Sequence, residues 1–145
     1  MSNSDYSKSD LVAALKGIGL KGGDLVFIHN SMFHLGRLEN GNSSKEVSRI
    51  VFDSFFEVLG TNGTLLVPTY TYSFCNDESF DVKNTPSSIG TFTEFFRNQK
   101  DAIRSADPIF SVSGIGPKSK TILSNLPKSC FGEDSVYDRI TKLNG

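Results

Sequence analysis

One stretch near the amino terminus limits the possible folds more than any other. Residues 25–28 are four apolar residues in succession, and the polar residues His29, Asn30 and Ser31 follow at once. An unbroken apolar run is typical of a strand covered on both faces, because a half-exposed strand alternates apolar and polar residues. Open α/β sheets bind their ligands at the carboxyl ends of such strands. The stretch therefore predicts an α/β domain with a polar site at the end of a buried strand.

Composition limits the classes of partner. The chain has 145 residues, a formal net charge of -1 and 37% hydrophobic residues, which predicts a single domain over residues 1–145. A near-neutral balance gives no broad attraction for nucleic acid or an anionic membrane, so neither is expected as a partner. No apolar run is long enough for a membrane span, and the first residues do not have the pattern of a signal peptide, which predicts a cytoplasmic protein.

The two cysteines, Cys75 and Cys130, are far apart in the sequence and have no closely spaced partner. This spacing supports neither a disulfide framework nor a zinc site. We expect two reduced thiols and no bound metal.

Helix and strand signals alternate in the first half of the chain. Ser7 and Asp10 have the spacing of a capping box and predict a helix over about residues 9–17. Ser43 and Glu46 repeat that spacing at the start of the strongest helical pattern, which ends at about residue 60. Residues 64–69 predict a second buried strand. A strand, a helix and a strand in this order predict a parallel pair.

The second half contains a long polar and aromatic stretch over residues 70–90. A loop of this length in a compact domain is usually functional or mobile. Helices are predicted from Thr91, over about residues 117–124, and after the Gly-Glu-Asp-Ser segment at residues 132–135, with a third strand at residues 109–112. The whole pattern predicts a mainly parallel central sheet flanked by helices, in a three-layer sandwich.

Several short motifs occur along the chain in an order that is typical of one enzyme family. They are residues 23–31, residues 60–69, Phe80 with Asp81, residues 85–87 with Gly90, Phe96 with Arg97, Arg104 and Ser105 with Pro108, Ser111 with Gly114 and Gly116, and residues 131–135. In this order they resemble the aminoglycoside 3-N-acetyltransferase family. The resemblance implies an acetyl-coenzyme A-dependent N-acetyltransferase, with direct transfer to an amine of an amino sugar in a ternary complex.

The chain departs from the family pattern in three respects. Asn30 stands where the family commonly has Ser, and Asp107 where it commonly has His, which implies a divergent branch of the family and leaves the acceptor open between an aminoglycoside and another amino sugar. Family chains also continue beyond residue 145 into another strand and a segment with a catalytic histidine and its acidic partner. The fold is therefore expected to be incomplete relative to the family, with an exposed sheet edge that favours self-association. The alternative function is a coenzyme A-binding fragment or half-protein that needs a complementary chain.

The resemblance also implies roles for individual residues. Thr69 is predicted to place a catalytic hydroxyl near the thioester, because acetyl transfer needs donors aimed at the thioester oxygen. Three carboxylates of the long loop are predicted to attract a cationic amino sugar, namely Asp77, Glu78 and Asp81. The residues predicted to contact coenzyme A are His29, Ser31, Met32, Arg104, Ser105, Ser111 and Phe131.

Each of these assignments has a plainer alternative. A histidine at a strand end often has a structural role, a serine after a strand is often part of a turn, and loop carboxylates are usually just solvated. Gly114 and Gly116 follow a predicted strand, but Ser119 occupies the third position of the dinucleotide motif, which indicates a tight turn. Cys75 with His29 or His34 as a base is a further arrangement, for which the spacing gives no support.

Overall fold

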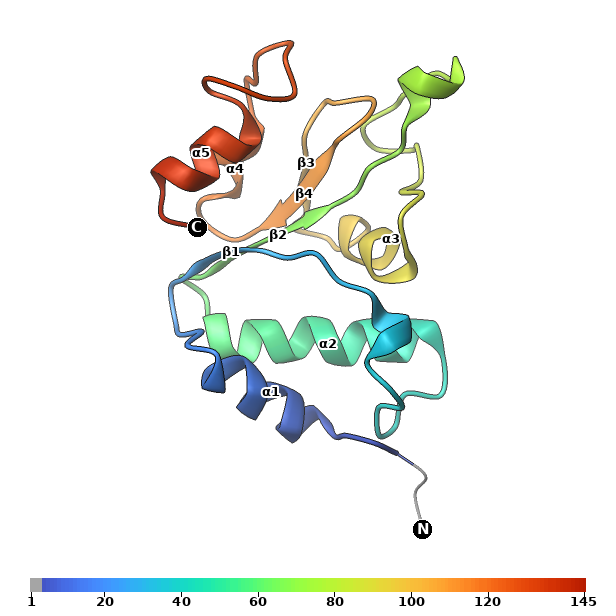
Figure 1. Cartoon of the computed structure of the whole chain (residues 1–145), viewed down its shortest axis with the longest axis vertical. Coiled ribbons are helices and arrows are strands. Elements are labelled where there is room, and N and C mark those ends of the chain that lie inside the picture. The colour runs from blue at the N-terminus through green and yellow to red at the C-terminus, as the bar shows by residue number, and fades with distance from the viewer. Residues whose placement is uncertain (1–3) are drawn as a thin grey trace.

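The structure is a computed structural model that describes residues 4–145, apart from the side chain of Phe33. Four strands form one sheet in the order β1-β2-β4-β3, with helices on both faces (Figure 1). The elements are α1 (Lys8–Gly17), β1 (Leu25–Phe27), the 3-10 turn η1 (Met32–His34), α2 (Ser44–Leu59), β2 (Thr64–Pro68), the 3-10 turn η2 (Ser73–Asn76), α3 (Thr91–Arg97), β3 (Ile103–Arg104), β4 (Val112–Ile115), α4 (Ser119–Leu123) and α5 (Val136–Lys142).

The helix starts follow from local hydrogen bonds that the sequence predicts. The Ser7 side chain accepts the backbone N–H of Asp10, and the Asp10 carboxylate accepts the N–H of Ser7, so the capping box of α1 is confirmed. Ser43 accepts the N–H of Glu46 at the start of α2, and Ser135 caps α5 in the same way. Each cap satisfies an N–H group that has no acceptor within its own helix.

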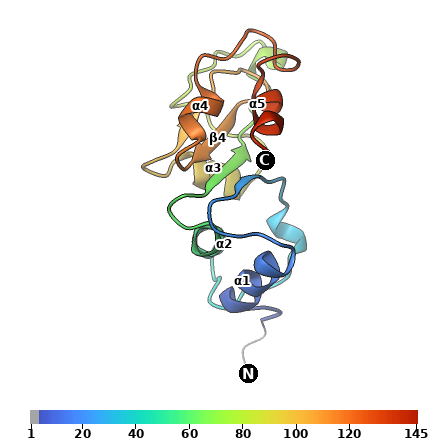
Figure 2. The ribbon, with the colours of Figure 1, turned by 90° about the vertical axis from the view of Figure 1, so that its left-hand side faces the viewer.

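Strand β2 lies at the centre of the molecule, and all five of its residues are buried. Because side chains alternate along a strand, Leu65 and Val67 pack against α1, α2 and α3, whereas Leu66 packs against α4 and α5. Figures 1 and 2 show α1 and α2 stacked together on one side of the sheet, with α4 and α5 on the other. The α/β class and the sheet covered on both faces are confirmed.

The expectation of a mainly parallel sheet is wrong for the described strands. Strands β1 and β2 are parallel, as predicted, but β2 pairs with β4, and β4 with β3, in antiparallel fashion. The predicted third strand at residues 109–112 also begins later, at Val112. The reason is local, because the Asp107 carboxylate accepts the N–H groups of Ile109 and Phe110 and folds these apolar residues into a turn. The turn reverses the chain between β3 and β4.

Candidate functional site

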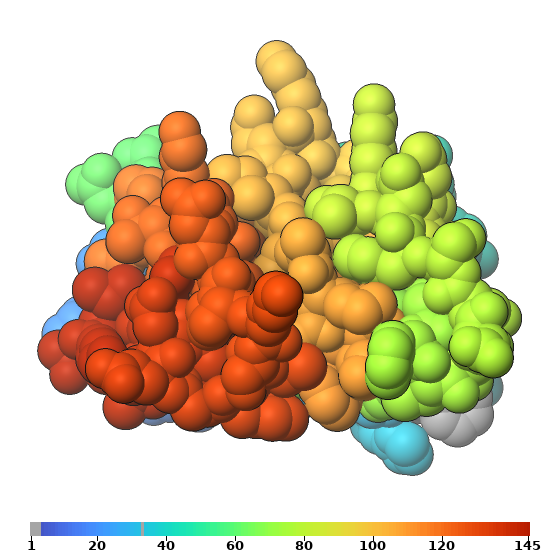
Figure 3. Space-filling view, turned by 90° about the horizontal axis from the view of Figure 1, so that it is seen from above, coloured from blue at the N-terminus to red at the C-terminus, as the bar shows by residue number. Residues whose placement is uncertain are grey.

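The candidate site lies where β1 and β2 end. These strands are parallel, so their carboxyl ends meet at one edge of the sheet, with residues 29–31 after β1 and Thr69 after β2. Residues 70–90 and the turn between β3 and β4 lie beside this edge. In Figure 3, seen from above, residues 70–90 (yellow-green) and residues 124–135 (orange-red) form opposite sides of one face.

Thr69 lies inside the sheet. It forms a closed hydrogen-bond network with Ser113 of β4 and with Ser111, the residue that precedes β4. Its Oγ1 donates to the carbonyl oxygen of Ser111 at 3.1 Å and lies 3.1 Å from the Oγ of Ser113. Ser111 Oγ donates in turn to the carbonyl oxygen of Thr69 at 2.7 Å. All three residues are 0% exposed. The Thr69 hydroxyl therefore joins β2 to β4, and its predicted catalytic role would require that a ligand reach this network.

Arg104 is the centre of the polar contacts beside this network. Its Nη2 donates to the carbonyl oxygen of Thr69 at 2.7 Å, and its Nε donates to Ser111 Oγ at 3.1 Å. Its Nη1 donates to the carbonyl oxygens of Thr85 at 2.6 Å and Val82 at 3.3 Å. The guanidinium also lies 5.2 Å from the centre of the Phe80 ring. Arg104 thus holds residues 80–85 against the strand ends.

Burial of Arg104, with a smaller effect of the positive charge of Arg97, lowers the pKa of its guanidinium to about 10. Ser105, the next residue, is also occupied, since its Oγ accepts the N–H of Val112 at 2.9 Å. The structure therefore brings Thr69, Arg104, Ser105 and Ser111 together. Their polar groups already bind protein atoms, and their contact with coenzyme A stays a prediction.

The three predicted acceptor-binding carboxylates are exposed on the loop of residues 70–90. Asp81 stabilises its own loop, because its Oδ1 accepts the N–H groups of Lys83 at 2.9 Å and Asn84 at 2.6 Å. Asp77 adopts a left-handed backbone conformation with φ of 58° after η2, and Glu78 follows it. Only Asp81 is close in sequence to the carbonyl groups that Arg104 holds, so Arg104 restrains the position of Asp81 more directly than that of Asp77 and Glu78.

An aromatic cluster occupies the other part of the site. Its members are Phe27, His29, Tyr70, Tyr72, Phe110, Phe131 and Tyr137, each with its ring centre within 6.2 Å of another member's. Phe131 stacks on Tyr137 at 5.3 Å, and Tyr137 meets the edge of Phe27 at 5.9 Å. The cluster therefore joins two predicted cofactor residues, His29 and Phe131, from opposite ends of the chain.

One hydrogen bond stabilises the interior of this cluster. The hydroxyls of Tyr70 and Tyr137 are 2.8 Å apart, and burial followed by this contact raises the pKa of Tyr137. Sequence reasoning missed Tyr70, Phe110 and Tyr137 as site residues. The only local signal is the pair of tyrosines at positions 70 and 72, directly after a buried strand.

The residues after β1 differ in whether their side chains already have partners within the protein. Ser31 Oγ lies 2.9 Å from Nδ1 of His34, in a local hydrogen bond, and Met32 packs against the core under α1, α2 and α3. The Asn30 Nδ2 atom is buried and has no hydrogen-bond acceptor among residues 4–145. A buried amide without an acceptor is costly, and it is a donor that a ligand oxygen can use.

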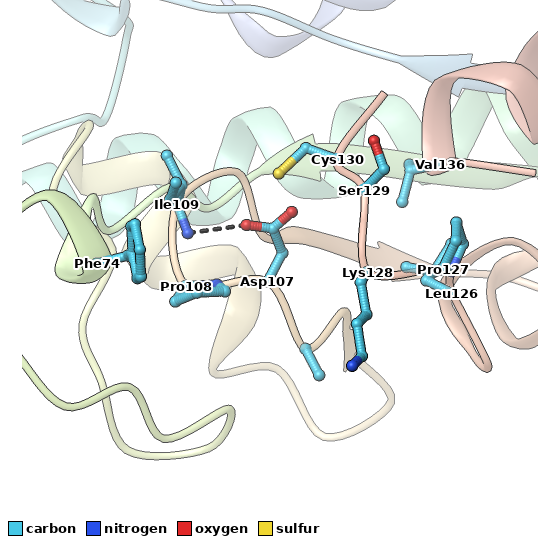
Figure 4. Close-up of a pocket in the computed structure, with 11 residues that line it drawn as sticks. Phe74, Asp107, Pro108, Ile109, Leu126, Pro127, Lys128, Ser129, Cys130 and Val136 are labelled. Carbon is cyan, nitrogen blue, oxygen red and sulfur yellow. Dashed lines mark hydrogen bonds between the residues drawn. The ribbon is translucent and has the colours of Figure 1, made fainter. Parts of the chain in front are cut away.

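A cavity of about 270 Å³ lies next to the cluster, between the turn of residues 106–109, residues 126–130, Phe74 and Val136 (Figure 4). The Asp107 Oδ1 accepts two backbone N–H groups at 2.8 Å each. Figure 4 shows the sulfur of Cys130 directed toward the same carboxylate. Burial, and then the hydrogen bond and the negative charge of Asp107, raise the pKa of the Cys130 thiol to about 11.

The structure also bears on the glycines, the cysteines and the metal and membrane signals that the sequence analysis considered. A side chain at Gly114 would overlap with Leu66, and one at Gly116, which has φ of 124°, would overlap with the backbone of Gly63 and Thr64, so these glycines serve a tight turn and close packing. Cys75 and Cys130 are both free thiols. Within residues 4–145 no cluster of three potential metal ligands occurs, and no helix is long and apolar enough to cross a membrane.

Comparison with known proteins gives a consistent result. Residues 27–145 match the sequence profile of the family described as aminoglycoside 3-N-acetyltransferase. Aminoglycoside N(3)-acetyltransferase III of Serratia marcescens is 26% identical over 93% of this chain and 55% of that protein. A mutant of AAC(3)-IVa solved in complex with apramycin is 27% identical with a TM-score of 0.80, over 99% of this chain and 55% of that chain.

A more distant structure has the same fold. AAC-IIIb, solved as a binary complex with CoASH, is 21% identical with a TM-score of 0.80, over 95% of this chain and 56% of that chain. The chain therefore spans about half the length of the relatives it matches.

Proposed function

The chain belongs to the aminoglycoside 3-N-acetyltransferase family, and from this premise we propose that it takes part in acetyl transfer from acetyl-coenzyme A to an amine of an amino sugar. The single observation that carries the proposal is the family match over residues 27–145. The binding of CoASH by AAC-IIIb and of apramycin by AAC(3)-IVa supports the two ligand classes.

The residues after β1 are the proposed contacts of the cofactor. Ser31, Met32 and His29 lie along one strand end, where backbone N–H groups and hydroxyls suit a pyrophosphate and a pantetheine arm. Asn30 adds an amide N–H without an acceptor in the described chain. Phe131 is 58% exposed on the aromatic cluster and offers an apolar face to the same arm.

The residues around Arg104 have a supporting role in this proposal. Arg104, Ser105 and Ser111 keep the strand ends and the loop in register, and Thr69 lies within that frame. Asp77, Glu78 and Asp81 give the loop a negative potential that attracts a protonated acceptor.

The proposed chemistry is direct transfer without a covalent acyl-enzyme. The amine must be neutral to attack the thioester carbon, so a general base takes its proton, and hydrogen-bond donors stabilise the charge that develops on the thioester oxygen. The residues proposed for this chain supply binding and donors. The base is not one of them.

Calorimetric titration with coenzyme A, followed by a thiol-release assay with acetyl-coenzyme A and apramycin, tests the proposal. We expect coenzyme A to bind, His29→Ala and Asn30→Ala to weaken that binding, and Lys16→Ala on the distant helix α1 to leave it unchanged. Binding without thiol release would favour the narrower function of holding coenzyme A for a complementary chain. If coenzyme A does not bind to the folded chain, the proposal is wrong.

A further inference from the structure

The cavity beside Asp107 lies outside the strand-end residues assigned above. Its walls are mainly apolar and include Pro108, Ile109, Leu126, Pro127 and Val136. Asp107 and Lys128 are its charged residues. In Figure 4 the Lys128 side chain extends away from the Asp107 carboxylate, so the inner wall carries one negative group.

The Asp107 carboxylate has a fixed direction and spare acceptor capacity. Two backbone N–H groups bind Oδ1 and hold the side chain in place. The thiol of Cys130 is a weak hydrogen-bond donor, and none of the ion pairs among residues 4–145 involves Asp107. A carboxylate with two oxygen atoms has about four acceptor positions, so it can accept further N–H donors from a ligand.

The volume limits what can enter. Pockets for drug-sized ligands measure about 300–1,000 Å³, and this cavity of about 270 Å³ is just below that range. It therefore has room for one compact ring or a short alkyl group. A ring with an amino substituent matches both the apolar walls and the single carboxylate.

We propose that this cavity is a binding subsite for a protonated amino group carried on a compact ring whose C–H groups pack against the apolar walls, with Asp107 as the residue that selects for the positive charge. A carboxylate favours the protonated form of a neighbouring amine. The amine bound here is therefore not the nucleophile, which must be neutral. It is a second amino group of the acceptor, and this last assignment rests on the proposed function.

Titration of the isotope-labelled chain with cyclohexylamine and with cyclohexanol, followed by NMR, tests the subsite directly. The two probes share shape and differ in charge. We expect cyclohexylamine to bind at least about tenfold more tightly, because a hydrogen bond to a charged group contributes that much. The chemical shifts of Asp107, Ile109 and Cys130 should move.

Two variants complete the test. Asp107→Asn keeps an oxygen for the N–H groups of Ile109 and Phe110 and removes the charge, so we expect it to abolish the preference for the amine. Asp101→Asn, at an exposed carboxylate outside the cavity, should retain it. Equal affinity of the wild-type chain for both probes would overturn the proposal even if Asp107→Asn does not fold. So would an unchanged preference in folded Asp107→Asn.

Measuring coenzyme A binding distinguishes a failure of this proposal from a failure of the proposed function. Asp107→Asn should bind coenzyme A as the wild-type chain does. Failure of coenzyme A binding together with selective binding of cyclohexylamine would reject the acetyltransferase role and retain the subsite.

Discussion

The two halves of the candidate site differ in how completely their polar and apolar groups are used. Around Arg104, the guanidinium, the Thr69 and Ser111 hydroxyls and the carbonyl groups of Val82 and Thr85 form a closed hydrogen-bond network. The aromatic cluster and the cavity beside it are open by comparison. Phe131 is 58% exposed, Tyr72 is 38% exposed, and one carboxylate faces the cavity.

This difference separates residues that stabilise the structure of the site from residues that can bind a ligand. A buried acceptor that already has its donor gains little from a ligand, whereas an exposed ring or a spare acceptor gains from one. The motif residues Arg104, Ser105 and Ser111 therefore set the shape of the site, and the residues of the open half are better placed to contact ligands. The predictions below test this division, from the largest expected effect to the smallest.

The largest effect should follow from Arg104→Ala. The change leaves the carbonyl group of Thr85 without its donor and removes one of the two donors of the Thr69 carbonyl group. We expect a loss of about 3 kcal/mol in the free energy of unfolding. Urea denaturation measures the loss. Arg104→Lys keeps the charge without the forked geometry and should lose less, and Arg37→Ala, at an exposed arginine, should be neutral. Equal stability of Arg104→Ala and wild type would show that the network does not hold the loop.

The reactivity of the Cys130 thiol should report on the surroundings of the cavity. The Cys130 thiol has a pKa raised from 9.0 to about 11, so at pH 8 a Cys75→Ser chain should react with iodoacetamide about tenfold to a hundredfold more slowly than an unperturbed thiol. The folded state holds this proton more tightly than the unfolded state, so stability should fall as the pH rises from about 9 through about 11.

Asp107→Asn provides the matched variant for that measurement. It removes the negative charge that contributes to the raised pKa, so alkylation of Cys130 should become faster. An unchanged rate in a folded Asp107→Asn chain would contradict the contact between the thiol and this carboxylate. Mass spectrometry of the alkylated peptide gives both rates.

Tyr137→Phe should have a smaller effect, since it removes one hydroxyl contact inside the aromatic cluster. The lost hydrogen bond to Tyr70 should lower the free energy of unfolding by about 1 kcal/mol. Tyr72→Phe is the control, because the Tyr72 hydroxyl has no hydrogen-bond partner among residues 4–145. A loss as large as that of Arg104→Ala would mean that the open half is as important for stability as the closed network.

Phe131→Ala should change stability least, by about 0.5 kcal/mol or less, because more than half of the side chain is exposed. If the open half binds the cofactor, the same variant should weaken coenzyme A binding severalfold in calorimetry. Reduced stability with unchanged affinity for coenzyme A would show that Phe131 has a structural role and does not contact the cofactor.

The sequence was most informative where a short stretch contains its own physical cause. The apolar runs of β1 and β2 predicted strands covered on both faces, and Ser7, Ser43 and Ser135 predicted helix starts that the structure confirms. A helix cap depends on atoms only three residues apart, and an unbroken run of apolar side chains indicates that a strand is buried on both faces. The order of motifs also predicted the family, which the comparison confirms.

The rest depended on contacts between residues that are far apart in the chain. Strand β3 has two residues and exists because it pairs with β4, so no local pattern predicted it or the antiparallel half of the sheet. The aromatic cluster joins residues 27–29, residues 70–72, Phe110, Phe131 and Tyr137, and only the fold brings these together. The sequence by itself therefore determined the buried strands, the helix starts and the family. The tertiary structure decided strand direction, the partners of Arg104 and the surroundings of Asp107, because pairing and burial of distant segments are properties of the folded chain as a whole.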